Sequence, residues 1–335
     1  MGQILRRYSF AVPYLLLAPG IIWLAVFYVY PGFQMFLTSL WTGTLESGFE
    51  LTWNWDTYGK ALGQFEPQFL RSIVFAGAAT VLTFLISYPL AYTIAFKGGR
   101  AKNLLLFLVV APFFTSFLLR TLSWELILGD DGVFLGPLKG LGLVPDDFRV
   151  LATPLAVVSG ITYNFLAFMT LPIYVSLEKI DRRLVEAAED LYAGPWRPGG
   201  SIWGAILGGG LGAFLGLAFG IGPVVLGIIG TVVGGLIGTF LISQAFMRIV
   251  LPLSLPGVFA GTLLTFIPAA GDFVNAELLG SPSTRMIGNV IQSRFLTLND
   301  YPVASALSFM LMAGILLAVA VYARLLGTEQ LAASA

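Results

Sequence analysis

The chain has 335 residues, of which 57% are hydrophobic and only 11% are charged. A water-soluble domain carries roughly 25% charged residues, so this composition excludes an ordinary soluble fold and indicates a surface that largely faces lipid. The 18 basic and 18 acidic residues cancel, and the absence of Cys and His excludes thiolate chemistry and imidazole-based catalysis or metal binding.

Stretches of about 20 mostly apolar residues predict six membrane-spanning helices and therefore an all-α integral membrane protein. In chain order they are about Val12–Phe36, Phe69–Phe96, Leu104–Leu122, Thr153–Leu177, Gly257–Phe273 and Val303–Leu326. The first stretch is interpreted as an uncleaved span, because no small-residue cleavage site follows it.

The basic residues of the loops favour one orientation. With six spans, the N-terminus, the 97–103 loop, the 178–256 segment and the C-terminus lie on one side of the membrane. That side carries 11 of the 18 basic residues but only six of the 18 acidic ones. Because short basic loops stay in the cytoplasm, we expect both termini to be cytoplasmic.

On the opposite side, residues 123–152 contain four aspartates among glycines and prolines, which is typical of a solvated loop with short interfacial helices.

Arg120 and Glu125 lie near the outer end of the third span, where we expect them to pair with each other. Asn164, in the middle of the fourth span, is expected to form a hydrogen bond between helices in preference to binding a ligand.

Residues 184–191 predict a short helix in the long cytoplasmic segment. Glu186 and Asp190 are four residues apart and therefore share one face, Ala187 and Ala188 allow close approach, and Gly194 ends the helix. This composition suits docking into a groove of a soluble partner, and it equally suits a capped surface helix that connects two spans.

Residues 197–243 are an unusual insertion with 15 glycines and a single charge, Arg197. Two runs repeat glycine every four residues, Gly204 to Gly220 and Gly230 to Gly238, and Gly222-Pro223 separates them. Each arm is about 20 residues, which matches the ~30 Å hydrocarbon core. We expect a glycine-zipper hairpin that crosses the membrane and returns, with a re-entrant or surface hairpin as the alternative.

A resemblance to a known family decides between the two interpretations of helix 184–191. Glu186-Ala187-Ala188 with Gly194, followed after the insertion by residues 244–257 ending Leu255-Pro256-Gly257, resembles the two-part cytoplasmic signature loop of bacterial ABC-importer permeases. In that family this loop forms the coupling helix that docks on the ATP-hydrolysing subunit. Further stretches of the C-terminal third, 266–274, 277–280, 286–289 and 301–306, resemble the first permease subunit of spermidine/putrescine importers.

The resemblance implies a six-span permease domain formed by residues 1–196 and 244–335, in a bacterial inner membrane. It also implies a second permease subunit, two ATPase subunits and an extracytoplasmic substrate-binding protein as partners. The sequence has no phosphate-binding GxxxxGK[ST] loop, so we expect no enzyme activity and no cofactor in this chain, with ATP and Mg²⁺ bound by the partner. The expected ATPase-coupling residues are Glu186, Ala187, Ala188, Asp190 and Gly194.

A cationic polyamine would need carboxylates and aromatic faces along its path. The candidates are Asp272, Phe273 and Glu277 at the outer end of the fifth span, and Tyr163 and Asn164 in the fourth span. For Asp272 and Glu277, a helix end that simply meets water is an equally good interpretation.

The sequence leaves two other functions open. One is an importer permease for a different small solute, which a neighbouring gene for the binding protein would distinguish. The other is a self-contained channel or secondary transporter with a glycine-zipper pore, which would transport without ATP as the purified chain alone.

Overall fold

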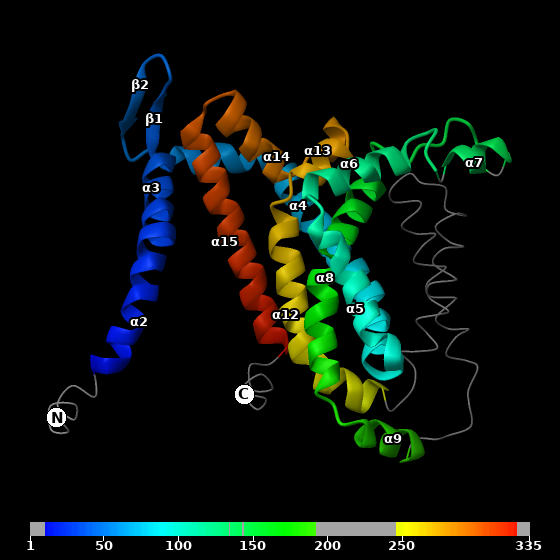
Figure 1. Ribbon diagram of the computed structural model, residues 1–335. Helices are drawn as coiled ribbons and strands as arrows, with labels where there is room; N and C mark the ends of the chain where they lie inside the picture. Colours follow the sequence, from blue (N-terminus) through cyan, green and yellow to red (C-terminus); the bar gives the residue numbers. More distant parts are fainter. Residues whose placement is uncertain (1–10, 134, 143, 192–245, 327–335) are drawn as a thin grey trace, which may run out of the picture. The chain divides into compact units, whose positions relative to one another are not determined.

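The computed structural model describes residues 11–133, 135–142, 144–191 and 246–326, which form two compact units (Figure 1). The first unit comprises the described residues up to Glu66 together with Val290–Leu316. The second comprises the described residues of Pro67–Asn289 and those from Leu317 onward. The insertion 197–243 and Gly194 lie outside the described residues, so the predicted glycine-zipper hairpin stays a prediction.

The first unit is a set of apolar helices with one small hairpin. Its elements are α2 (Ala11–Leu24), a π-helical turn (Ala25–Val29), α3 (Tyr30–Ser39), β1 (Trp41–Thr44), β2 (Gly48–Leu51), the start of α4, the π-helical turn Ser293–Thr297 and most of α15 (Tyr301–Leu326). The strands pair antiparallel with Trp41 opposite Leu51. Aromatic contacts hold the unit together, including Phe36 against Phe309 at 5.7 Å and Phe49 against Tyr301 at 5.4 Å between ring centroids.

The second unit is built around one central helix, α8 (Pro154–Glu178), which has buried residues along its whole length. The elements before it are α4 (Asp56–Tyr92) with its π-helical end (Thr93–Lys97), a 3₁₀ turn (Gly99–Ala101), α5 (Lys102–Val110), a second 3₁₀ turn (Ala111–Phe114), α6 (Phe117–Leu128) and α7 (Leu135–Gly140). After it come α9 (Arg182–Leu191), a π-helical turn (Phe246–Val250), α12 (Leu251–Ala270), α13 (Val274–Leu278), a 3₁₀ turn (Pro282–Thr284) and α14 (Ile287–Gln292).

Small residues let α12 pack tightly on α8. A Cβ on Gly257 would meet the carbonyl oxygen of Pro172 and the side chain of Ser176, and one on Gly261 would meet Met169 Sδ at 2.8 Å. Glycine at both positions therefore sets the distance between the two helices, as is common for helices that associate in lipid.

Five of the described helices are long and apolar enough to cross a membrane, which confirms the predicted helical membrane class. They are Leu16–Ser39, Asp56–Lys97, Pro154–Glu178, Leu251–Ala270 and Tyr301–Arg324. The second of these begins well before the predicted Phe69, because the polar residues from Asp56 onward continue the same helix.

The predicted third span, 104–122, differs from a straight crossing helix. Residues Gly99–Phe114 and Phe117–Leu128 form two helical segments bent by 96°. Thr115 is extended, with φ −100° and ψ 151°, and a 3₁₀ turn that contains Pro112 precedes it. The ladder of helical hydrogen bonds therefore stops at Thr115, which leaves a broken span or a re-entrant segment.

Candidate functional site

The predicted helix 184–191 exists as α9 and begins two residues earlier, at Arg182. The Asp181 carboxylate accepts a hydrogen bond from the backbone N–H of Arg183 at 3.0 Å, which starts the helix in the manner of an N-cap. α9 follows α8 after a short turn and lies at the end of the second unit away from α6 and α13 (Figure 1).

An apolar cluster anchors α9 to the membrane-spanning helices. Ile180 and Val185 are buried in it, together with residues from the ends of α4, α8 and α12. Its other buried members are Tyr88, Ala91, Ala95, Met169, Ile173, Leu177, Phe246, Val250 and Val258. A force applied to α9 would therefore reach three long helices through packed side chains.

Polar contacts add to this anchor. The Arg182 guanidinium donates to the backbone carbonyl of Ala95 at 3.1 Å, and Lys102 Nζ lies 2.5 Å from the Glu178 carboxylate. These contacts connect the start of α9 to the end of α4, and the end of α8 to the start of α5. Sequence reasoning missed them, since their partners lie some 80 residues apart along the chain.

The outward side of α9 is free to meet another protein within the described structure. Glu186 and Ala187 are exposed, as are Arg183 and Leu184, whose side chain is 52% exposed. Ala188 and Asp190 lie on the same helix. The exposed set combines a carboxylate, a guanidinium, a small residue and an apolar residue, a mixture suited to a protein interface.

The residues on either side of the insertion meet at this site. Val185, before it, and Phe246 and Val250, after it, are buried in the same apolar cluster. Phe246 packs edge-to-face on Tyr88 with 5.3 Å between ring centroids. The two halves of the signature motif are thus adjacent in space, although 47 inserted residues separate them along the chain.

In the half of α8 that begins at Pro154, buried polar side chains form a chain of hydrogen bonds. Asn164 Nδ2 donates to Thr121 Oγ1 on α6 at 3.1 Å and to Asn275 Oδ1 on α13 at 3.0 Å. Asn275 in turn donates to both oxygens of Asp272, from its backbone N–H at 3.0 Å and from its amide at 2.5 Å. The expected interhelical hydrogen bond of Asn164 is confirmed, and the sequence did not reveal Asn275 as the link to Asp272.

The two candidate pathway carboxylates have different surroundings. Asp272 follows the end of α12 and is buried, and burial raises the pKa of its carboxyl. Glu277 is exposed, and its carboxylate accepts a hydrogen bond from Asn289 Nδ2 at 3.0 Å. Asn289 also donates to the backbone carbonyl of Phe273, whose ring is 39% exposed. Glu277 on α13 and Phe273, the residue before that helix, are therefore both exposed and four residues apart.

Tyr163 and Arg120 both contact aromatic rings. Tyr163 packs edge-to-face on Trp124 with 5.4 Å between ring centroids. The Arg120 guanidinium lies over Phe113 at 5.0 Å and over Phe117 at 5.8 Å. The expected pairing of Arg120 with Glu125 is wrong, since Nε and Nη1 of Arg120 are buried without a hydrogen-bond partner among the described residues.

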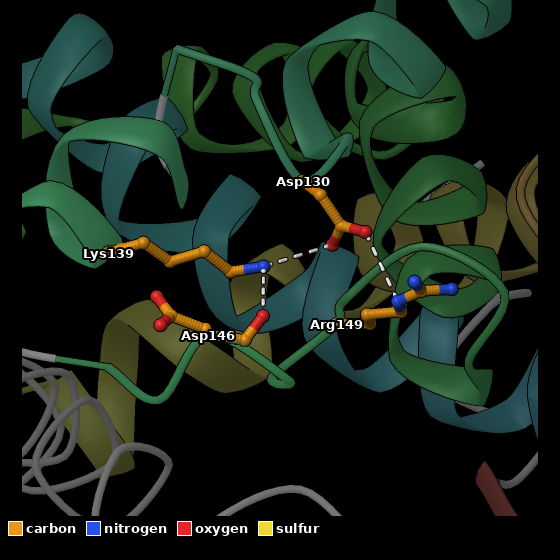
Figure 2. Close-up of polar contacts among 4 residues, drawn as sticks. All are labelled: Asp130, Lys139, Asp146 and Arg149. Atoms are coloured by element: carbon orange, nitrogen blue, oxygen red, sulfur yellow. Dashed lines mark hydrogen bonds and ion pairs between the residues drawn. The ribbon is translucent and has the colours of Figure 1, made fainter.

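The loop before α8 is held by a cluster of charged side chains. Figure 2 shows that Asp130 accepts from Lys139 Nζ at 3.3 Å and pairs with Arg149 Nε at 3.1 Å. Lys139 also donates to the backbone carbonyl of Asp146 at 2.9 Å. Asp131, Asp146 and Asp147 are exposed, as expected for a solvated loop. The cluster fixes the segment around α7 at the end of the second unit opposite α9 (Figure 1).

The bundle of spans and its anchored external helix define a polytopic membrane protein of the transporter class, and comparisons with known proteins identify its family. Residues 243–326 match the family described as "Binding-protein-dependent transport system inner membrane component". The chain is 32% identical over 303 residues to the "Spermidine/putrescine transport system permease protein PotB" of Haemophilus influenzae, covering 90% of each chain. It is 30% identical over 290 residues to the protein of that name in Escherichia coli K12, covering 86% of this chain and 88% of that one.

Solved structures agree on the fold. A chain of a bacterial ABC transporter involved in the import of the acidic polysaccharide alginate superposes with a TM-score of 0.60 over 97% of both chains, at 18% sequence identity. A second alginate transporter structure, in complex with a substrate-bound periplasmic protein, gives a TM-score of 0.61. The chain therefore belongs to the ABC-importer permease family and is a multi-pass inner-membrane transport subunit.

Proposed function

We propose that this chain is the polyamine-translocating permease subunit of an importer whose ATP hydrolysis occurs in a separate subunit. The relatives named as spermidine/putrescine permeases support this cargo, because the similarity extends over nine-tenths of the chain. The exposed pair of Glu277 and Phe273 fits a cationic, partly apolar substrate, since a carboxylate and an aromatic face both attract ammonium groups.

α9 is the proposed coupling helix. The single observation that supports this function is that the outer side of α9 is exposed while its inner side, at Val185, is buried against the spans. Val185 fixes α9 to three spans, while Glu186 and Ala187 remain available to a groove on the ATPase subunit. Movement of the ATPase would be passed to α4, α8 and α12 as a rigid-body displacement, the usual basis of alternating access. We propose that α9 and both termini lie on the cytoplasmic side of the membrane.

The proposed partners follow from this orientation. The second permease subunit and two ATPase subunits complete the complex, and ATP with Mg²⁺ is bound by the ATPase subunits. The loop held by Asp130, Lys139 and Arg149 then faces outward, where an extracytoplasmic binding protein would deliver the substrate.

Charge reversal at Glu186 tests the coupling role. We expect Glu186→Lys to reduce ATP-dependent uptake in proteoliposomes by at least about tenfold, because a charge at a protein interface that becomes mismatched costs several kcal/mol. Gly194→Asp is expected to act in the same direction. Glu46→Lys, which reverses another exposed charge, on the β1–β2 turn, is the matched control and keeps normal uptake. Normal uptake by Glu186→Lys in fully inserted protein would refute the assignment.

Neutralisation of Glu277 tests the substrate class. Glu277→Gln should slow spermidine uptake severalfold, because the site loses its charge attraction for ammonium groups while its shape is kept. Asp131→Asn removes an exposed carboxylate from the outer loop and should have little effect. Asp272→Asn, compared with the same Asp131→Asn control, should also slow spermidine uptake. Uptake of an anionic solute that falls equally in Glu277→Gln would remove this residue from the pathway.

A further inference from the structure

A hydrogen bond between two hydroxyl groups joins α4 to α12, and its donor belongs to the apolar cluster that anchors α9. The Tyr88 hydroxyl lies 2.6 Å from Ser254 Oγ, and both side chains are buried. Ser254 donates its own hydroxyl proton to the backbone carbonyl of Leu251, at 3.0 Å. Tyr88 is therefore the donor in the bond between the two helices.

α9 contacts the irregular ends of both helices, close to this bond. Arg182 donates to the carbonyl of Ala95 in the π-helical end of α4, and α9 contacts the π-helical turn Phe246–Val250 that precedes α12. Tyr88 and Ser254 lie in the regular parts of the helices, five residues before the first turn and four residues after the second. The hydrogen bond therefore joins the two regular helices next to the segments that α9 contacts.

The residue before Tyr88 fixes α4 to α8 at the same level. Ser87 Oγ donates to the backbone carbonyl of Leu166 at 3.1 Å and accepts a hydrogen bond from Thr170 Oγ1 at 2.9 Å. Since Ser87 and Tyr88 are consecutive, one turn of α4 is bonded to both α8 and α12. α12 itself packs closely against α8 at Gly257. Three spans are thus joined to one another at this level.

We infer that the Tyr88 hydroxyl is a positioning group for transport, because it makes α4 and α12 move as one body when α9 is displaced. A hydrogen bond is directional, whereas apolar contacts are not and permit small sliding movements. Without the bond, part of the displacement of α9 would be lost as sliding of α4 along α12, and ATP would be hydrolysed without transport. This inference rests on the proposed function, which supplies the ATPase that moves α9.

The first unit contains a matched pair for comparison. The Tyr58 hydroxyl lies 2.6 Å from Ser39 Oγ, and Ser39 donates to the backbone carbonyl of Phe36, three residues earlier. The bond length and the order of donors are those of the pair formed by Tyr88 and Ser254. Neither Tyr58 nor Ser39 belongs to the cluster that anchors α9. This second pair therefore controls for the loss of a Tyr–Ser hydrogen bond as such.

Removal of the two tyrosine hydroxyls tests the inference. Tyr88→Phe removes the hydroxyl and keeps the packing of the ring. In proteoliposomes with the assembled transporter, the ATP hydrolysed per spermidine imported should rise by at least about threefold, because loss of one hydrogen bond between membrane helices shifts an equilibrium by about this factor. Tyr58→Phe should leave this ratio at the wild-type value. An equal rise in both variants would overturn the inference.

Substitution of Ser254 separates positioning from stability. Ser254→Ala removes the acceptor of the buried Tyr88 hydroxyl and should lower the Tm of the detergent-solubilised transporter. Addition of Tyr88→Phe should restore most of the Tm, because the unpaired hydroxyl is then gone. The ratio of ATP to spermidine should nevertheless stay raised in the double variant. A ratio that recovers together with the Tm would indicate a purely structural role and overturn the inference.

Failure of the proposed function gives a different result. If the wild-type chain retains no ATPase subunit, or if the assembled wild-type complex shows no ATP-dependent uptake of spermidine, the proposed function fails and the inference fails with it. If the wild-type complex imports spermidine and Tyr88→Phe hydrolyses no more ATP per spermidine than the wild type, the inference alone is overturned.

Discussion

Asn164 is the residue on which the outer half of the second unit depends most. Its amide joins α8 to α6 through Thr121 and to α13 through Asn275, and all three side chains are buried. Within a membrane, such hydrogen bonds between helices contribute about 0.6–2 kcal/mol. Their loss would also leave Thr121 and Asn275 without this donor in an apolar environment.

We predict that Asn164→Leu destabilises the detergent-solubilised protein by about 1–3 kcal/mol, since the shape is nearly kept while two buried acceptors each lose a hydrogen bond. Thermal unfolding followed by tryptophan fluorescence measures this loss. Asn103→Leu makes the same substitution at an exposed position and should leave the Tm unchanged. Equal Tm values for the two variants would show that the hydrogen bonds of Asn164 contribute nothing to stability.

Part of this network could be predicted from the sequence. An amide in the middle of an apolar span indicates a hydrogen bond between helices, and this was confirmed for Asn164. The bond from Asn164 to Asn275, 111 residues later, and the surroundings of Arg120 depend on how distant segments meet. For Arg120 the nearest acid in sequence, Glu125, suggested a pair that the fold does not make.

Among the elements, the contact between α8 and α12 depends on two glycines. Gly257 leaves room for the backbone of α8 at Pro172, and any added Cβ would lie 2.5 Å from Ser176 Oγ. This is closer than atoms of neighbouring helices can approach, so one of the helices would have to shift.

We therefore expect Gly257→Ala to destabilise the protein by about 1–3 kcal/mol through overpacking. Gly77→Ala provides the matched control, since a Cβ at Gly77 in α4 meets no atom within 4 Å. The control should be neutral or slightly stabilising, because alanine is the better helix former. A Gly257→Ala variant as stable as Gly77→Ala would mean that α8 and α12 are not closely packed at this position.

Hydropathy is sufficient to predict the long helices, but it does not predict the break within the third predicted span. Five apolar stretches became five long helices, because backbone groups in lipid must be hydrogen-bonded within the helix. The break at Thr115 and Ser116 is invisible to hydropathy, since the segment is apolar on both sides. Pro112 was the available signal, because proline often precedes such interruptions.

At the scale of the whole molecule, the proposed transport function depends on the position of α9 relative to the membrane. The motif Glu186-Ala187-Ala188 led to the family through its resemblance alone, and the structure adds that the second half of the motif, from Phe246, returns to the same apolar cluster. Spacing along the chain could not establish this return, because the insertion separates the two halves. An exposed helix fixed to three spans is the feature that an external ATPase would require.

Cross-linking from α9 tests this claim most directly. The chain has no cysteine, so Ala187→Cys gives a single attachment point for a photoreactive maleimide. Leu126→Cys, 78% exposed on α6 at the opposite end of the second unit, is the control. The prediction is that, in the assembled transporter, the probe at position 187 cross-links the ATPase subunit and the probe at 126 does not. It would be contradicted if position 187 were labelled by an impermeant reagent from outside intact cells, or if its probe never reached the ATPase.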